Sequence, residues 1–158
     1  MRFVDNNKLL LVVIPVFLFL GFLAGSLFSE KPLNDPGGIW HDTVHKSPYK
    51  YRPNLNLSLE YMKGKEYGLC VGYAERAIKI APDKAAAYLN AGSCYIQQKN
   101  WLGAYNMFFK LQKLKPNKIS VQNLSGLAKL MGNKKVSELW AAKLKDAPEL
   151  KMEYADGN

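Results

Sequence analysis

The sequence predicts an all-α protein in which one N-terminal transmembrane helix precedes a short solenoid of antiparallel helix pairs. Two observations support this prediction. The segment from Leu9 to Phe28 contains twenty residues without a charge, and prolines recur at a spacing of 34 residues, at Pro48, Pro82 and Pro116. Twenty residues of α-helix span about 30 Å, the thickness of the hydrocarbon core of a bilayer. A fixed period of this length is typical of stacked helix pairs.

The uncharged segment, extended to residues 9–29, is predicted to be a retained transmembrane helix. A cleaved signal peptide is the alternative, because Ala24-Gly25-Ser26 offers small residues for cleavage, but the apolar run of a signal peptide is usually only about 7–15 residues long. Arg2 and Lys8 precede the helix. By the positive-inside rule we expect a single-pass protein of a bacterial inner membrane, with a cytoplasmic N-terminus and periplasmic helix pairs.

Gly21 and Gly25 lie four residues apart within the predicted membrane helix. Small residues at this spacing let two transmembrane helices approach each other closely. The two glycines are therefore candidate contacts to another membrane helix, and the alternative is that this side of the helix faces lipid.

A short helix is expected before the first full repeat, within residues 38–50 and after a hinge at 30–37. Trp40 lies 34 residues before Ala74, so we expect it to be buried at the aromatic position of a second helix. His41 and His45 are four residues apart, a spacing that would allow both to bind one metal ion. Since the sequence offers no third ligand nearby, we expect two exposed histidines, no metal and no cofactor.

The second full repeat, residues 85–118, shows the pattern of large and small side chains most clearly. Its characteristic residues are, in order, Tyr88, Ala91, Gly92, Tyr95, Ala104, Phe108, Leu111 and Pro116. This series resembles the tetratricopeptide repeat (TPR) family, although that family usually has alanine at the position of Leu111. Small residues at Gly92 and Ala104 would let the two helices of a pair approach closely. Pro116 is expected to end the second helix, because proline cannot continue the hydrogen-bond ladder.

The first full repeat, residues 51–84, and the last helix pair, residues 119–148, follow the pattern less closely. The corresponding residues of the first repeat are Asn54, Leu57, Ser58, Tyr61, Cys70, Ala74, Ala77 and Pro82. Asn54 is a poor substitute for the large side chain usual at its position. The last pair is shortened, as expected of a terminal unit whose outer face must be soluble. Residues 1–8 and 149–158 are predicted to be a flank and a tail.

The resemblance implies a binding groove on the concave side of the array, formed by the first helix of each pair. The residues at its groove positions are Leu55, Leu59, Met62, Leu89, Asn90, Ser93, Ile96, Gln97, Gln122, Asn123 and Lys129. Apolar and amide side chains suit an extended peptide or a partner helix. The alternative is that several of the apolar residues pack against one another. TPR domains that grip a chaperone's C-terminal carboxylates use paired Lys and Asn, and since only Asn90 matches, we do not expect that activity.

The net charge of +9 is unevenly distributed, because residues 99–145 contain ten lysines and one acid, Glu138. A solvated basic face is one interpretation, and an acidic protein partner or anionic lipid headgroups are the other. Nucleic acid is not expected, since no recognised nucleic-acid module is present. No catalytic set of residues is apparent. We therefore expect a non-enzymatic scaffold or assembly factor, with an accessory subunit of a larger membrane complex as the alternative.

Cys70 and Cys94 both fall within helical patterns and lack the spacing of a zinc site. Buried free thiols are the default expectation for such residues. A disulfide is the alternative if the domain lies in an oxidising compartment.

Overall fold

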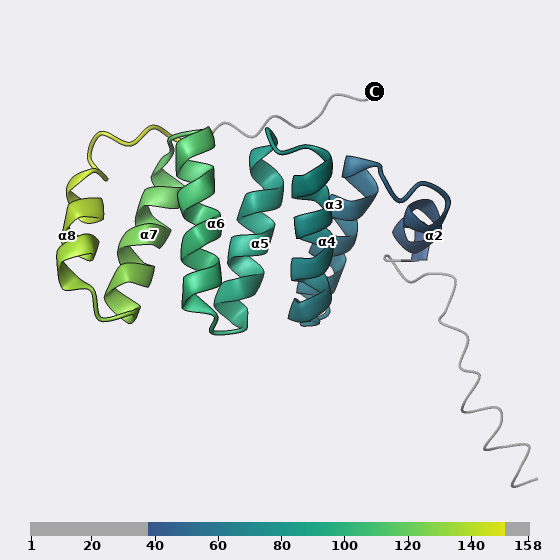
Figure 1. Cartoon of the computed structure of the whole chain (residues 1–158), viewed down its shortest axis with the longest axis horizontal. Helices are drawn as coiled ribbons and strands as arrows, with labels where there is room; N and C mark the ends of the chain where they lie inside the picture. The colour runs from purple at the N-terminus through teal and green to yellow at the C-terminus, as the bar shows by residue number, and fades with distance from the viewer. Residues whose placement is uncertain (1–37, 151–158) are drawn as a thin grey trace, which may run out of the picture. The chain divides into compact units, whose positions relative to one another are not determined.

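The computed structural model describes residues 38–150, which form a row of packed α-helices (Figure 1). The helices in this part of the chain are α2 (Gly38–Lys46), α3 (Tyr51–Lys63), α4 (Tyr67–Ile80), α5 (Ala85–Gln97), α6 (Trp101–Leu114), α7 (Lys118–Leu130) and α8 (Lys134–Ala142). The prediction of an all-α protein is thereby confirmed for these residues. The predicted transmembrane helix at residues 9–29, with Gly21 and Gly25, lies outside them. None of the helices between residues 38 and 150 has the length and apolar character needed to cross a membrane.

The described helices pack as pairs of neighbours along the chain, α3 with α4, α5 with α6 and α7 with α8. Successive pairs are joined by contacts of α4 with α5 and of α6 with α7, and α2 packs on α3. A further contact joins α3 to α5, the first helices of two successive pairs. In the row of helices that Figure 1 shows, the first helices α3 and α5 are therefore direct neighbours.

Glycines and aromatic rings set the distance between α5 and α6. A Cβ atom at Gly92 would lie 2.7 Å from Cε2 of Phe108, and one at Gly103 would lie 2.9 Å from Cδ1 of Tyr95. The surrounding core extends from α4 to α7 and comprises Ala74, Tyr88, Ala91, Ala104, Met107, Phe108, Leu111, Leu124 and Leu127. Small residues thus allow close approach, as the repeat pattern predicts, and aromatic side chains fill the space around them.

Left-handed backbone conformations close the turns within the three described helix pairs. Lys65 and Lys99 have φ angles of 62° and 58°, and Gly132 has a φ of 77°. Glycine adopts this conformation without steric cost, whereas a residue with a Cβ does not. Asn100 and Asn133 then cap α6 and α8, each accepting a hydrogen bond from a backbone N–H three residues further on.

Asn54 occupies the position that Tyr88 occupies in the second repeat, and it is fully buried. Its Nδ2 donates to the carbonyl of Pro48 at 2.9 Å, just as the Tyr88 hydroxyl donates to the carbonyl of Pro82 at 3.0 Å. The Asn54 amide also donates to the carbonyl of Lys50. Asn54 thus keeps one hydrogen bond of the kind that Tyr88 makes, while its Oδ1 is buried without a hydrogen-bond partner among the described residues.

The short helix α2 is attached to the first pair through residues other than the one expected. Val44 is buried, whereas Trp40 is half-exposed. His41 is half-buried, and its Nε2 lies 2.8 Å from the hydroxyl of Tyr61, whose ring stacks on Tyr73. The expected burial of Trp40 and exposure of His41 were wrong, because the face that α2 presents to the first pair holds His41 and Val44, three residues apart. Trp40 flanks that face.

Cys70 of α4 and Cys94 of α5 form a disulfide, with their Cα atoms 6.3 Å apart. The default expectation of free thiols was therefore wrong. The repeat itself explains the pairing, since close packing of successive helix pairs brings a small residue of α4 against a small residue of α5. The bond covalently joins the first pair to the second.

The segment after α8 returns to the start of α7. The backbone N–H of Lys118 donates to the carbonyl of Pro148 at 2.7 Å, and Nζ of Lys118 lies 3.1 Å from Oε1 of Glu149. The helix α8 is itself held through Trp140, whose indole N–H donates to the hydroxyl of Tyr105 at 3.0 Å. Residues 148–149 therefore lie beside the loop that joins α6 to α7.

Candidate partner-binding groove

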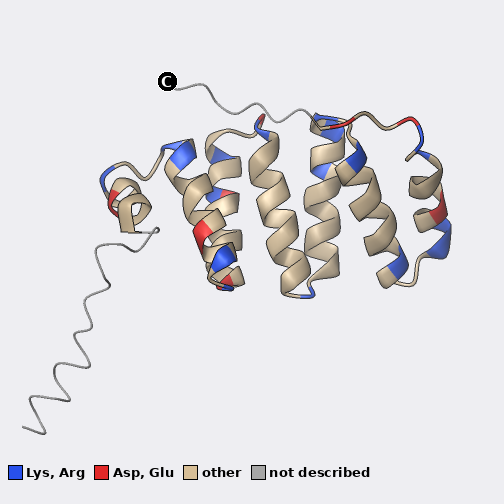
Figure 2. Ribbon diagram, turned by 180° about the vertical axis from the view of Figure 1, so that it is seen from behind, with Lys and Arg blue, Asp and Glu red and all other residues tan. Residues whose placement is uncertain are grey.

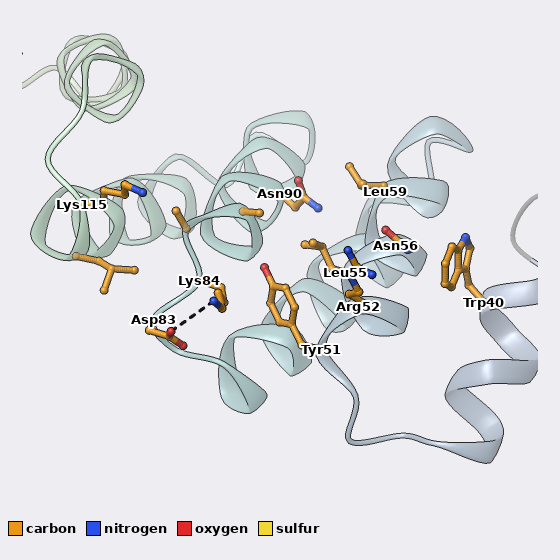
Figure 3. A pocket seen from close by; sticks show the side chains of 13 residues that line it. Trp40, Tyr51, Arg52, Leu55, Asn56, Leu59, Asp83, Lys84, Asn90 and Lys115 are labelled. Atoms are coloured by element: carbon orange, nitrogen blue, oxygen red, sulfur yellow. Dashed lines mark ion pairs between the residues drawn. The ribbon is translucent and has the colours of Figure 1, made fainter. Parts of the chain in front are cut away.

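A hollow of about 690 Å³ opens beside the first helices of the first two pairs (Figure 3). We call it the groove, and its lining comprises Trp40, Tyr51, Arg52, Leu55, Asn56, Leu59, Asp83, Lys84, Ala85, Ala86, Asn90, Leu114 and Lys115. These residues come from α2, α3, the turn before α5, the first half of α5 and the end of α6. The volume lies in the range usual for ligand-binding pockets.

The 34-residue period explains the shape of the groove. Tyr51 and Arg52 at the start of α3 correspond to Ala85 and Ala86 at the start of α5. The two alanines leave space where the first repeat has large side chains. The groove is therefore lined by large side chains on α3 and by small ones at the start of α5. Leu55, one turn further along α3, continues this lining as an apolar surface.

A short chain of hydrogen bonds joins α3 to α5 at the groove. Nδ2 of Asn90 donates to Oγ of Ser58 at 2.9 Å, and this hydroxyl donates to the carbonyl of Leu55 at 2.6 Å. Ser58 is fully buried. Two residues of the groove lining, Leu55 and Asn90, are thus ordered through one buried hydroxyl.

Positive charge surrounds the groove. Arg52, Lys84 and Lys115 contribute cations to the described lining, and Asp83 contributes a carboxylate 3.9 Å from Nζ of Lys84. This pair, drawn in Figure 3, is weak, because the Asp83 side chain is 71% exposed. Burial raises the pKa of Tyr51 to about 12, and the charge of Asp83 acts in the same direction. The Tyr51 hydroxyl is therefore protonated at neutral pH.

The sequence pattern and the structure overlap in part of the groove. Leu55, Leu59 and Asn90 line it. Leu89 and Ile96 instead pack against the hydrophobic core, and Met62 packs beside the disulfide. These three apolar side chains therefore pack within the protein, which was the alternative to a role in the groove.

The other five predicted groove residues are polar and lie outside the lining. Gln97, Gln122 and Lys129 are exposed. Ser93 and Asn123 are half-buried, and Nδ2 of Asn123 donates to the carbonyl of Ile119 on its own helix at 2.8 Å. The structure does not bring these five side chains together with Leu55 and Leu59.

The repeat pattern did not predict several residues of the groove lining. Trp40 comes from α2, and Leu114 and Lys115 come from the end of α6. Positions counted along first helices cannot include them, because they reach the groove only through tertiary packing. The sequence does single out Lys84, because each of the three prolines that recur every 34 residues is followed two residues later by a lysine.

The ten lysines between residues 99 and 145 do not gather in the groove. Lys115 lines it, whereas the other nine are absent from its described lining. Figure 2 shows that basic residues in this part of the chain lie mostly at turns and helix ends, and α5 carries no charged residue. The basic excess is therefore spread along the ends of the helices.

The groove lining combines apolar side chains with a hydroxyl group, amides and cations. Between residues 38 and 150, no group of three or more His, Cys, Asp or Glu side chains is placed to hold a metal ion. The groove lining in this range contains neither histidine nor cysteine. Its apolar surface, protonated hydroxyl and cations suit recognition of a segment that carries apolar and acidic side chains.

Comparison with known proteins shows similarity in structure. No protein-family model and no curated protein matches the chain. The fold is similar to that of MamA, residues 41 to the end, from Desulfovibrio magneticus RS-1, with 18% identity, a TM-score of 0.64 and coverage of 70% of this chain and 63% of that one. It is also similar to YrrB, described as a TPR protein with an unusual peptide-binding site, with 15% identity, a TM-score of 0.61 and coverage of 70% and 57%. The chain thus spans less than two thirds of the length of these structures, and its described helices form an array of TPR type.

Proposed function

We propose that the chain is a membrane-anchored protein of TPR type that binds a segment of a partner protein in the groove. It acts as a scaffold or assembly factor and not as an enzyme. The observation that carries the proposal is the groove itself, a hollow of about 690 Å³ with apolar side chains from Leu55, Leu59 and Leu114. Binding energy at such a surface comes from a few apolar anchors that fill it.

The chemistry of the groove defines the partner segment. Arg52, Lys84 and Lys115 favour acidic side chains, which would also set the direction of the bound segment. The apolar surface favours leucine-like or aromatic anchors beside these acids. The similarity to YrrB, which is described as having a peptide-binding site, supports a peptide as the bound form.

A membrane anchor at residues 9–29 would keep the groove near the bilayer. Eight residues, 30–37, separate it from α2, and a fully extended segment of that length spans at most about 28 Å. The partner would then be a membrane protein or a protein held at the membrane surface. The disulfide supports a periplasmic position of the helix pairs, because disulfides persist in oxidising compartments.

Substitution of one groove leucine tests the proposal. Leu55→Asp places a charge on the apolar wall, and Leu130→Asp is the matched control, since Leu130 is 63% exposed and lies outside the groove lining. In affinity purification from native membranes in mild detergent, we expect the unsubstituted chain and Leu130→Asp to recover the same partner. Leu55→Asp should recover at least tenfold less while its helical circular dichroism is retained. Equal recovery by both variants, or no partner for the unsubstituted chain, contradicts the proposal.

Gly21 and Gly25 favour a second candidate function, that of an accessory subunit held in a larger complex by its membrane helix as well. Their spacing would let another transmembrane helix approach closely. Gly21→Leu combined with Gly25→Leu should then reduce co-purification of the complex while Leu55→Asp does not. Unchanged co-purification of the double variant excludes this candidate.

A further inference from the structure

Aromatic rings of α6 and α8 form one connected cluster. The rings of Tyr105 and Phe109 stack along α6 with their centroids 6.2 Å apart, and the Trp140 ring of α8 meets that of Phe109 edge-on at 6.3 Å. The indole N–H of Trp140 donates to the Tyr105 hydroxyl. All three side chains are only half-buried. These contacts therefore hold Phe109 and Trp140 at defined positions on the surface of the array.

A lysine side chain covers each of these two rings. Nζ of Lys113 lies 4.7 Å from the centroid of the Phe109 ring, and Nζ of Lys143 lies 4.9 Å from that of the Trp140 ring. Both lysines are exposed, and no carboxylate among residues 38–150 lies within ion-pair distance of either. A ring face attracts an ammonium group but carries no net charge. Two positive charges therefore remain available beside the rings.

Exposed leucines extend this surface along both helices. Leu102 is 63% exposed and Leu139 is 59% exposed. Leu102 lies seven residues before Phe109, and Leu139 lies four residues before Lys143, so each leucine shares a helix face with that neighbour. We call the whole set the aromatic–lysine surface, and it comprises Leu102, Phe109, Lys113, Leu139, Trp140 and Lys143. None of these six residues belongs to the described lining of the groove.

Negative charge is scarce around the aromatic–lysine surface. The helix α6 contains no acidic residue, and α8 contains one, Glu138. Glu138 precedes Trp140 by two residues, which places it about 200° away around the helix, and its carboxylate lies 3.9 Å from Nζ of Lys134. Asp146, in the segment after α8, makes no ion pair with Lys143. The surface is therefore complementary to an anionic partner that also accepts apolar side chains.

We propose that the aromatic–lysine surface docks on a bilayer that contains anionic phospholipids. The rings and leucines enter the boundary between headgroups and acyl chains, and the lysine stems follow them while their ammonium groups reach the phosphates. Lysine is a point charge on a flexible stem, which suits mobile headgroups better than the fixed carboxylates of a folded protein. This docking goes beyond the proposed function, because it uses residues other than those that line the groove.

Photocrosslinking of the full chain in vesicles tests the preference for anionic lipid. The variant Leu139→p-benzoylphenylalanine should form a phospholipid adduct in vesicles of equimolar phosphatidylcholine and phosphatidylglycerol, as detected by mass spectrometry of the intact chain. In pure phosphatidylcholine the adduct should be at least fivefold weaker, because each lysine at an anionic surface contributes about fivefold to binding. The same probe at Leu130, which is 63% exposed on α7, should give no adduct. Equal adducts in the two lipid compositions, equal adducts at the two positions, or no adduct at Leu139 overturns the proposal.

Removal of the two charges tests the role of the lysines. Lys113→Gln combined with Lys143→Gln should reduce the adduct at position 139 at least fivefold in the vesicles that contain phosphatidylglycerol. Lys79→Gln combined with Lys129→Gln removes the same charge from exposed positions on α4 and α7 and should leave the adduct unchanged. An equal loss in both double variants would show that only net charge matters, and no loss in the first would show that its lysines take no part; either result contradicts docking through this surface.

The same probe at Leu139, used in native membranes, distinguishes lipid from an acidic protein partner. We expect an adduct with the mass of a phospholipid, and a crosslink to another protein alone would overturn the proposal. Leu55→Asp should leave the lipid adduct unchanged, since Leu55 lies in the groove. Loss of partner recovery and loss of the lipid adduct are therefore separate results, so that either proposal can fail while the other stands.

Discussion

Gly92 lies where α5 and α6 are closest, and it has no room for a side chain. A Cβ at this position would lie 2.7 Å and 2.9 Å from two atoms of the Phe108 ring, which is 1% exposed and therefore cannot move aside. We expect Gly92→Ala to lower the free energy of unfolding by about 1–3 kcal/mol, the usual cost of overpacking. Thermal unfolding followed by circular dichroism measures it. Gly72→Ala is the control, because its Cβ meets no atom within 4 Å; a Gly92→Ala variant as stable as this control would show that the two helices can separate.

Gly132 shows a different use of glycine, set by the backbone alone. Its φ is 77°, and a Cβ there would meet nothing within 4 Å, so any cost of Gly132→Ala comes from the left-handed conformation. We expect a loss of about 1 kcal/mol in the free energy of unfolding. Gly126→Ala in the preceding helix, also in open space, should instead gain up to about 1 kcal/mol from helix propensity. Chemical denaturation of both variants gives the two signs, and a gain for both would contradict the role of this turn.

The sequence predicted single residues well where one repeat constrains them and poorly where two units meet. Gly92 is recognisable because its small size is part of the repeat pattern. Asn54 is not, because its amide replaces the hydrogen bond of a tyrosine and not its volume. Trp40 occupies a position that is buried in a full repeat, but half a repeat leaves one side of that position open.

The disulfide is the strongest link between two elements, since it joins α4 to α5 across the boundary of two repeats. It closes a loop with a sequence separation of 24, which corresponds to about 3 kcal/mol of stability in the chain-entropy treatment. We expect the unfolding temperature to fall when reductant is added. The double variant Cys70→Ala, Cys94→Ala should have the same low unfolding temperature with and without reductant. If reduction leaves the unsubstituted chain unchanged, the bond adds no stability, and helix packing alone joins the repeats.

The sequence could predict the groove residues that lie on first helices but not those that other helices contribute. Leu55, Leu59 and Asn90 follow from the repeat, because they occupy the positions that the repeat pattern assigns to the groove side of first helices. Trp40 and Lys115 do not follow from it, because α2 and the end of α6 become neighbours of α3 only in the folded array. The apolar residues Leu89 and Ile96 have the correct spacing for a groove, yet core packing buries part of them. Periodicity indicates which helix faces the groove, and packing between helices decides which side chains remain in it.

For the whole molecule, the remaining prediction is the side of the membrane on which the helix pairs lie. If they are periplasmic, both cysteines should be oxidised in cells that make the protein, because that compartment is oxidising. Acid trapping followed by alkylation should then modify Cys70 and Cys94 only after reduction, and the intact protein should retain its full mass of 17.8 kDa with the anchor uncleaved. Cys70→Ser supplies the control, since it leaves Cys94 without its partner and open to direct alkylation. Direct alkylation of both cysteines in the unsubstituted chain would place the helix pairs in a reducing compartment. Oxidised cysteines on a chain of lower mass would instead support the periplasmic position but show that the N-terminal segment is cleaved, which excludes the anchor. The redox state of the cysteines therefore tests the orientation, which the positive-inside rule predicts. The mass of the intact protein tests the anchoring, which the length of the apolar segment predicts.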